Sequence, residues 1–433
     1  MPSAERDTAP ASRVEHQRLA PPTPPTSNGG RAAAFWGLAL INAFVGSMVG
    51  LERTVVPLLA ERDFGLRAGA TVGGFIIAFA LAKALSNLFA GAAADRWGRR
   101  RVLLIGWLVT LPVAPLLAWA PTWGVVVGAN ALLGIGQAFT WSMTLNMMVD
   151  LMPVRRRGFA AGINEFAGYL GVSLTAFLTG AIASQLGLRP WPFALGIALA
   201  LLGTALSLTT RETSPPGKPA PLRWTRGVGA PSLLGLATNL KDGLAWLALP
   251  LLLTGRGMSL TQIGLVAGLY PLLWAAGQPL FGPLSDRTGR RWLITLAMLL
   301  QGAGLALLAL TSSYPLALLA AAGMGLGTGM AYPVLIAVVA DRARASERAT
   351  ALGVYRFFRD GGYAVGALIA SLGLLDLAHV TALTGAAFAP LAVLAWTTLP
   401  PLRTLHSDRR RGGPANTKVA LPAGSDDQTD AAG

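Results

Sequence analysis

Long apolar runs recur along almost the whole of this 433-residue chain. About 20 helical residues, at a rise of 1.5 Å each, cross a hydrocarbon core of about 30 Å. Charged residues make up only 13% of the chain, against roughly a quarter in soluble proteins. The sequence therefore predicts an all-α integral membrane protein with twelve transmembrane helices. These are residues 33–60, 69–94, 101–120, 122–150, 159–186, 190–210, 231–254, 260–284, 291–312, 314–340, 348–374 and 377–400.

The two ends of the chain differ from this pattern. Residues 1–32 and 401–433 are polar, and the first of these segments is also rich in proline. We predict that both are disordered tails. Residues 1–32 contain no apolar core with a cleavage site, so no signal peptide is expected.

An internal repeat divides the membrane region into two parts. The segment GAAADRWGRRR, from Gly91, reappears as GPLSDRTGRRW, from Gly282, at a shift of 191 residues. The same shift carries Asp150 to Asp341. The two copies of the segment are separated by six predicted membrane crossings, which is an even number. The repeat therefore predicts two six-helix halves, 33–210 and 231–400, with the same orientation in the membrane. Residues 211–230 are basic and proline-rich, as expected of a linker between the halves.

The basic residues indicate orientation rather than a nucleic-acid partner. Of the 35 lysines and arginines, 26 fall in the tails and in the loops on one side of the predicted helices. Four lie on the other side, and five lie within helices. Basic residues concentrate on the cytoplasmic side of membrane proteins, so both termini are predicted to be cytoplasmic. A composition rich in arginine, alanine and leucine suggests a bacterial cytoplasmic (inner) membrane.

Several kinds of chemistry have no support in the sequence. Cysteine is absent, and the three histidines lie in the tails or next to the loop that precedes segment 377–400, so no metal site is expected. No GxxxxGK[ST] loop is present to hold a nucleotide phosphate. We therefore expect no enzymatic activity and no cofactor.

The repeated loop motif resembles a known family signature. Both copies are similar to the loop between the second and third helices of major facilitator superfamily (MFS) transporters. Its residues here are Gly91, Asp95, Arg96, Gly98, Arg99 and Arg100, and then Gly282, Asp286, Arg287, Gly289, Arg290 and Arg291. The resemblance implies a gating role, in which Asp95 closes the cytoplasmic side by contacts near the start of segment 348–374.

Two other family motifs are altered. In many proton-driven members an arginine stands four residues before a GxG, and here Asn130 takes its place. Proton antiporters often have a glycine-proline motif in the fifth helix, whereas GINEFAGYLG contains Glu165 and no proline. Both departures weaken an inference of drug/proton antiport.

Charged residues within the predicted helices are the main candidates for coupling or substrate binding. A charge near the bilayer centre costs about 2.5–3.5 kcal/mol, so such residues usually have a function. A structural ion pair is the alternative for each of them. The candidates are Glu52, Arg53, Lys83, Glu165, Lys241, Asp242, Arg356, Arg359 and Asp360.

Two of these candidates lead to specific hypotheses. Asp360 has a depth similar to that of Lys83 and Arg359, so it is predicted to pair with one of them in one state and to be released in another. Arg356 either contacts an anionic part of the substrate or extends to the cytoplasmic headgroups.

Three aromatic residues are candidates for the cavity wall. The repeat maps Trp141 onto Tyr332, so these two rings are expected to face each other across the cavity, with Trp246 nearby. Ordinary packing is the alternative for all three.

The function predicted from these features is secondary active transport by alternating access, as a monomer in the lipid bilayer. Proton-coupled export of a small organic solute is the first hypothesis. Proton-coupled uptake or exchange of an anionic metabolite is the second. The third is a membrane sensor that has a transporter fold and transports nothing.

Overall fold

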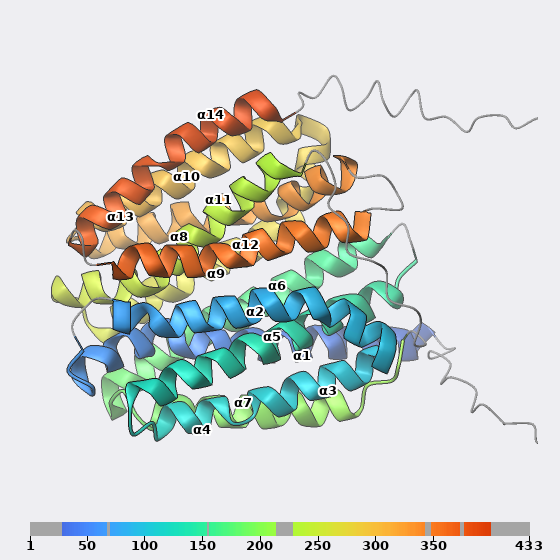
Figure 1. The fold of residues 1–433 in the computed structure, drawn as a ribbon, viewed down its shortest axis with the longest axis horizontal. Coiled ribbons are helices and arrows are strands. Elements are labelled where there is room, and N and C mark those ends of the chain that lie inside the picture. The colour runs from blue at the N-terminus through green and yellow to red at the C-terminus, as the bar shows by residue number, and fades with distance from the viewer. Residues whose placement is uncertain are drawn as a thin grey trace, which may run out of the picture.

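The computed structural model describes residues 28–66, 70–153, 156–213, 228–342, 348–372 and 376–399. In these ranges the chain is helical, with short turns between the helices (Figure 1). The helices are α1 (Asn28–Arg62), α2 (Ala70–Trp97), α3 (Arg99–Thr110), α4 (Val113–Ala118), α5 (Trp123–Asp150), α6 (Arg157–Leu186), α7 (Trp191–Leu208), α8 (Gly229–Gly255), α9 (Leu260–Thr288), α10 (Arg290–Leu310), α11 (Tyr314–Arg342), α12 (Arg348–Ser371), α13 (Leu377–Ala386) and α14 (Phe388–Thr398).

Two of the predicted segments are each built from two helices. The segment predicted at 101–120 consists of α3 and α4, and the segment predicted at 377–400 consists of α13 and α14. Proline has no backbone N–H, so it is accommodated most easily in the first turn of a helix. The new helix accordingly starts just before or after a proline, with Pro112 preceding α4 and Pro390 in the first turn of α14. Counting each pair as one segment confirms the prediction of twelve.

Ten segments of the described chain are long and apolar enough to cross a membrane by length and composition. The two that fall outside this count are α8 and α12. Each carries adjacent charged residues in its interior, Lys241 and Asp242 in α8 and Arg359 and Asp360 in α12. These two segments therefore need partners for their charges inside the bundle.

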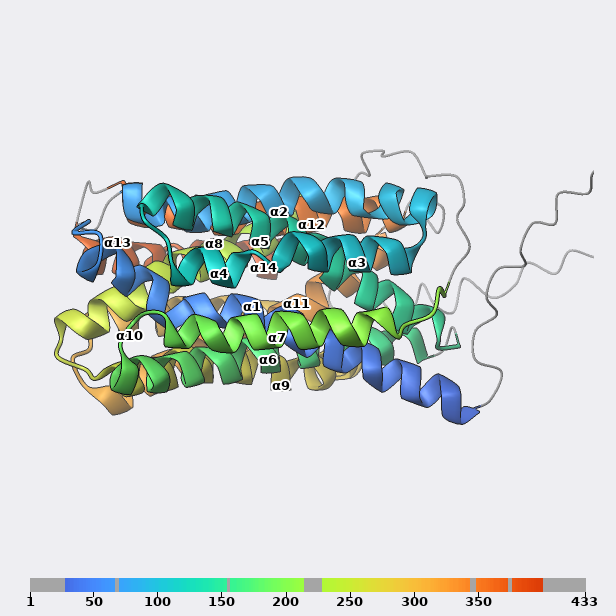
Figure 2. The same cartoon turned by 90° about the horizontal axis from the view of Figure 1, so that it is seen from below.

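The helices form two groups that face each other (Figure 1). Helices α1–α7 pack together, as do α8–α14. The pairs α1–α6 and α2–α5 of the first group correspond to α8–α12 and α9–α11 of the second. Two helix pairs make the most extensive contacts between the groups, α2 with α12 on one face and α6 with α9 on the opposite face (Figure 2). Helix α1 makes smaller contacts with α8 and α9 between them.

This boundary is packed differently at its two ends. The described chain starts and finishes at one end of the bundle, here called the terminal end (Figure 1). At the opposite end, a Cβ added to Gly180 would lie only 2.8 Å from the Cα of Gly264, and Thr261 donates to Ser184 at 3.0 Å. At the terminal end, a Cβ added to Gly91 or Gly353 would meet nothing within 4 Å. The two groups are therefore in tight contact at the opposite end, whereas at the terminal end α2 and α12 have room for a side chain at Gly91 and Gly353.

Candidate functional site

Polar and charged side chains gather near the middle of the bundle, where α2, α5, α6 and α12 meet. They line a central cavity of about 30 Å³, formed by Lys83, Asn87, Gln137, Trp141, Ser142, Glu165, Tyr169, Arg356, Arg359 and Asp360. A side cavity of about 10 Å³ shares Lys83 and Trp141 with it and adds Arg53 and Tyr363. One water molecule needs roughly 10–15 Å³. In this state, then, the charged centre is closed around at most a few waters.

A larger cavity, of about 520 Å³, lies elsewhere. It is at the terminal end of the first group, between α1, α5, α7 and residues 209–213. All of its lining residues belong to one group of helices, so it gives no passage between the two groups. We therefore take the central cavity as the candidate site, because its lining residues come from both groups.

Asp360 is held by two partners in the central cavity. Its side chain is 1% exposed, and one of its oxygens pairs with the Arg359 guanidinium at 2.8 and 2.9 Å. The other accepts a hydrogen bond of 2.7 Å from the Asn87 amide. Asn87 belongs to α2, so this carboxylate links the two groups of helices. Of the two partners predicted for Asp360, the structure shows Arg359.

The other two cations of the central cavity lack such partners. Lys83 and Arg356 make no hydrogen bond or ion pair with any residue that the structure describes. The Lys83 ammonium lies 5.5 to 5.8 Å from the ring centres of Phe79, Trp141 and Tyr363. At this separation each interaction is a cation–π contact, which supplies no negative counter-charge to the ammonium.

Cations outnumber anions in this part of the protein. The central cavity is lined by three basic side chains and by the two acids Glu165 and Asp360. Glu165 accepts a hydrogen bond of 2.9 Å from the Trp141 indole. With Asp360 already engaged by Arg359, Glu165 is the only other acid that lines the cavity, so Lys83 and Arg356 together carry a surplus of one positive charge. Such a surplus attracts anions and repels cations.

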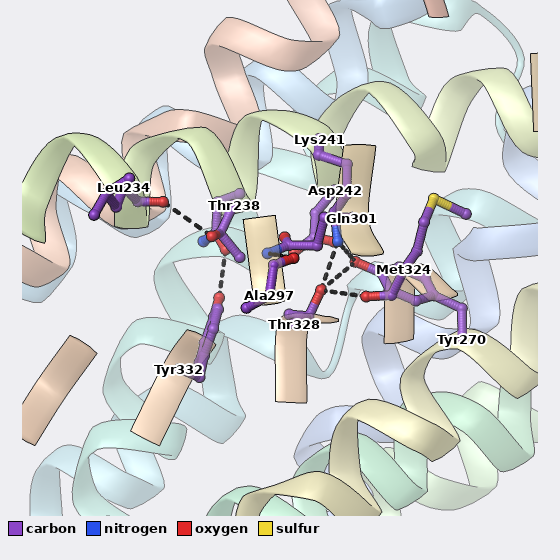
Figure 3. A network of polar contacts seen from close by, with 11 residues as sticks. Leu234, Thr238, Lys241, Asp242, Tyr270, Ala297, Gln301, Met324, Thr328 and Tyr332 are labelled. Atoms are coloured by element: carbon purple, nitrogen blue, oxygen red, sulfur yellow. Dashed lines mark hydrogen bonds and ion pairs between the residues drawn. The ribbon is translucent and has the colours of Figure 1, made fainter. Parts of the chain in front are cut away.

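A second charged cluster lies inside the C-terminal group of helices (Figure 3). Lys241 and Asp242 are fully buried and pair at 3.0 Å. The Lys241 ammonium also donates to the Tyr270 hydroxyl at 2.6 Å and to the Thr328 hydroxyl at 2.5 Å (Figure 3). These contacts join α8 to α9 and α11, so the cluster supports the packing within one group rather than lining the central cavity.

Glu52 and Arg53 occupy different environments although they are neighbours in α1. Glu52 is 0% exposed, and neither of its carboxyl oxygens has a hydrogen-bond partner among the described residues. The Arg53 guanidinium lies 4.7 Å from the ring centre of Trp246 and lines the side cavity. Glu52 is thus a buried acid with no cationic partner among the described residues, although the Asn130 side chain is close enough to interact with it. Arg53 instead faces the boundary between the groups.

The candidate aromatic residues are placed in two clusters. Trp141 and Tyr332 both contact Tyr169, with ring centres 5.2 and 6.2 Å away, so Tyr169 lies between them. The ring contacts of Trp246 are instead with Phe75 and Phe79 of α2. The expected pair is therefore bridged by a third ring, and Trp246 belongs to the other cluster.

Several residues of the site were not singled out from the sequence. Asn87, Tyr169 and Trp274 are neutral, so the rule that draws attention to charges in membrane helices passes over them. Trp274 stacks on Tyr169 with a centre separation of 3.6 Å. The internal repeat could have identified Trp274, because the 191-residue shift maps the candidate Lys83 onto it.

The repeated loop motif forms equivalent ion pairs in both halves. Arg99 pairs with Asp150, and Arg290 pairs with Asp341 at 2.6 Å, each joining the start of one helix to the end of another. In the first half, the carboxylate of Glu212 also accepts hydrogen bonds from two backbone N–H groups at the start of α3, at 3.0 and 3.1 Å. An anion at a helix N-terminus is stabilised by the helix dipole.

The predicted gating contact of Asp95 stays a prediction. Asp95 makes no hydrogen bond or ion pair within the described chain, and the side chains of residues 348–350 lie outside it. The side chain of Asp286 also lies outside the described residues.

The turn between α2 and α3 gives a first test. Gly98 has φ = +88°, and a Cβ there would lie 2.5 Å from a carboxylate oxygen of Glu212. Because a left-handed conformation costs a residue with a side chain about 1–2 kcal/mol, we expect Gly98→Ala to lower the melting temperature of the purified protein. Gly91→Ala is the matched control, with nothing within 4 Å. An unchanged melting temperature for Gly98→Ala would show that the turn is not constrained in this way.

Comparison with known proteins places the chain in a family. The sequence pattern of the Major Facilitator Superfamily matches residues 35–238 and 231–423. The chain therefore belongs to this superfamily, whose members are membrane transporters, and it is an integral multi-pass membrane protein. It has the fold of a solved mutant of the nucleoside transporter NupG, with a TM-score of 0.71 at 13% identity over 85% of this chain and 100% of the other.

Relatives of known sequence point to several kinds of transporter. The chain is 27% identical to the uncharacterized MFS-type transporter STM4428 of Salmonella typhimurium, over 75% of this chain and 85% of the relative. It is 29% identical to the multidrug efflux pump LfrA of Mycolicibacterium smegmatis, over 48% and 43% of the two chains. It is 25% identical to the probable sulfoacetate transporter SauU of Cupriavidus necator, over 59% and 65%.

Proposed function

We propose that this protein is a proton-driven secondary transporter that exports a small organic solute bearing an anionic group. The observation that carries the proposal is the surplus of cations in the central cavity. Lys83 and Arg356 line it without a hydrogen-bonding or ionic partner among the described residues. An unpaired cation that is partly buried in the bundle is costly, and an anionic ligand between the two groups of helices would offset that cost.

The arrangement of the two groups supports alternating access. They are tightly packed at the opposite end, and at the terminal end there is open space beside Gly91 and Gly353. With both termini in the cytoplasm, as the basic residues predict, solute would reach the site from the cytoplasm. Rocking of one group against the other about the central cavity would then expose the site to the other side.

Proton coupling is assigned to Glu52. Its carboxyl group is completely buried in α1, and no cation among the described residues pairs with it. A carboxylate in such a place has a high desolvation cost, and binding a proton removes that cost. Protonation of Glu52 would therefore favour the state in which this part of α1 is buried.

The direction of transport is supported by relatives. LfrA and the FUS6 protein of Gibberella moniliformis, at 29% and 24% identity, are named efflux pumps. A second candidate, uptake or exchange of an anionic metabolite, is favoured by the similarity to SauU and by the cation surplus itself. A sensor that transports nothing would bind solute without moving it across a membrane.

Thermal stabilisation of the purified protein tests the anion preference. A ligand present at 100 times its Kd stabilises the folded state by about 2.7 kcal/mol. We expect organic sulfonates to raise the melting temperature, and organic ammonium ions of similar size to leave it unchanged. In Arg356→Ala the affinity for sulfonates should fall about tenfold, equivalent to ~1.4 kcal/mol.

Arg62→Ala is the matched control for this test, because Arg62 is exposed at the end of α1. It should respond to sulfonates as the wild type does. Stabilisation by organic ammonium ions, unchanged in Arg356→Ala, would contradict the proposal and favour multidrug-type export.

A further inference from the structure

We infer that the solute is a small aromatic anion, whose ring stacks against Trp141 and Tyr169 while its anionic group lies between Lys83 and Arg356. This inference rests on the proposed function and names the substrate class for the same site. It depends on what kind of apolar surface the central cavity offers, which the charge balance alone does not determine.

The apolar surface of the central cavity is aromatic. Of its ten lining residues, only Trp141 and Tyr169 present large apolar surfaces, and none is leucine, isoleucine, valine or methionine. Their ring centres lie 5.2 Å apart with the planes inclined at 59°. Aromatic rings prefer offset-stacked or edge-to-face contacts with other rings. A flat ring therefore fits this wall better than a flexible alkyl chain of the same size.

The cation next to these rings is placed to hold an acidic group on the same ligand. The Lys83 ammonium lies 5.7 Å from the centre of the Trp141 ring. Lys83 belongs to α2, whereas Arg356 belongs to α12, so the two cations approach the cavity from different groups of helices. A carboxylate or sulfonate between them would bridge the boundary, and the attached ring would reach Trp141.

In this structure one face of the Tyr169 ring is already covered by another aromatic ring, that of Trp274. Across the boundary, Trp274 of α9 stacks on Tyr169 of α6 with a centre separation of 3.6 Å. The cavity has only about 30 Å³ of space in this closed state. When the two groups part, the face of Tyr169 that Trp274 covers is exposed at the boundary, and a substrate ring can take the place of Trp274. The stacked pair thus shows the geometry that we assign to the bound solute.

Binding of matched ligands to the purified full-length protein tests this inference. Benzenesulfonate and cyclohexanesulfonate carry the same charge and differ in the ring, whereas benzyltrimethylammonium keeps the aromatic ring and reverses the charge. By isothermal titration calorimetry we expect benzenesulfonate to bind about three- to tenfold more tightly than cyclohexanesulfonate. Benzyltrimethylammonium should show no binding.

Variants separate the contribution of the ring from that of the charge. Trp141→Leu should remove the preference for benzenesulfonate and leave the affinity for cyclohexanesulfonate nearly unchanged. Trp141→Phe, which keeps a ring, should restore most of the preference and serves as a check on folding. Lys83→Met should weaken the binding of both sulfonates alike.

The outcomes distinguish this inference from the proposed function. Equal affinities of the wild type for the two sulfonates would overturn the aromatic inference and leave the anion proposal standing. Tighter binding of benzyltrimethylammonium than of either sulfonate, or no binding of any of the three, would overturn both.

Discussion

In the Asp360→Asn variant we expect transport to fall at least tenfold and the protein to lose stability. The substitution removes the ion pair with Arg359 and replaces the carboxylate that accepts from Asn87. Arg359 is then left as a largely buried cation without its counter-charge, and breaking a buried pair in this way costs about 3–5 kcal/mol. The link between α2 and α12 is weakened at the same time, so the equilibrium between states should shift. Flux in proteoliposomes and thermal unfolding in detergent measure the two effects.

Asp63→Asn is a control for this variant. It removes another carboxylate that pairs with an arginine, Arg189, at 2.7 Å. That pair is partly exposed, and surface pairs contribute only about 0–1 kcal/mol. Transport that is unaltered in Asp360→Asn would show that the α2–α12 link is a passive packing contact.

Among the variants that should act on stability without acting directly on the central cavity, we expect Lys241→Met to have the largest effect. It leaves Asp242 fully buried with no cation and removes the donor to Tyr270 and Thr328 (Figure 3). We expect a loss of about 3–5 kcal/mol in the free energy of unfolding, seen as a lower melting temperature. Methionine has nearly the same length, so the loss comes from charge and hydrogen bonding rather than from a cavity.

Two further variants make this prediction specific. Lys241→Met/Asp242→Asn removes both charges and should recover part of the lost stability, because no buried charge is then left alone. Lys83→Met, which removes a lysine that has no ion pair among the described residues, should change the melting temperature much less. If Lys83→Met were the more destabilising of the two lysine variants, the structural assignment of Lys241 would be wrong.

The sequence was sufficient to predict twelve helical segments, ten of which satisfy the same length and hydropathy requirement. The breaks near Pro112 and Pro390 did not appear in that prediction. A hydropathy pattern averages over about 20 residues, whereas a proline acts on a single hydrogen-bonded turn. The two prolines are visible in the sequence, but the breaks beside them do not alter the number of membrane crossings.

The candidate site was predicted less completely. Charges in apolar helices directed attention to five residues that the structure brings together in the central cavity: Lys83, Glu165, Arg356, Arg359 and Asp360. Lys241 was a candidate of the same kind, but it lies in a separate cluster. Position along a helix determines depth, whereas pairing also depends on how each helix is rotated and on which helix it packs against, and a single sequence contains little of that information.

The neutral residues of the site were also missed from the sequence. Asn87 holds Asp360 and Trp274 stacks on Tyr169, yet asparagine and tryptophan are ordinary residues in membrane helices. Applying the internal repeat to each candidate would have drawn attention to Trp274, because it occupies the position equivalent to Lys83. The two halves have kept the backbone positions and changed the chemistry of the side chains.

Accumulation of benzenesulfonate in proteoliposomes tests the central claim most directly. A sulfonate stays charged at any working pH, so it does not cross the bilayer as a neutral acid. The membrane potential is held at zero, pH gradients of either sign are imposed, and protein-free and Glu52→Gln liposomes serve as controls. The account predicts accumulation above the external concentration when protons leave the lumen, and none in either control. Accumulation only with the reverse gradient would indicate proton-coupled uptake instead. Equilibration without accumulation under both gradients, or no protein-dependent movement at all, would contradict proton-driven transport of an organic anion.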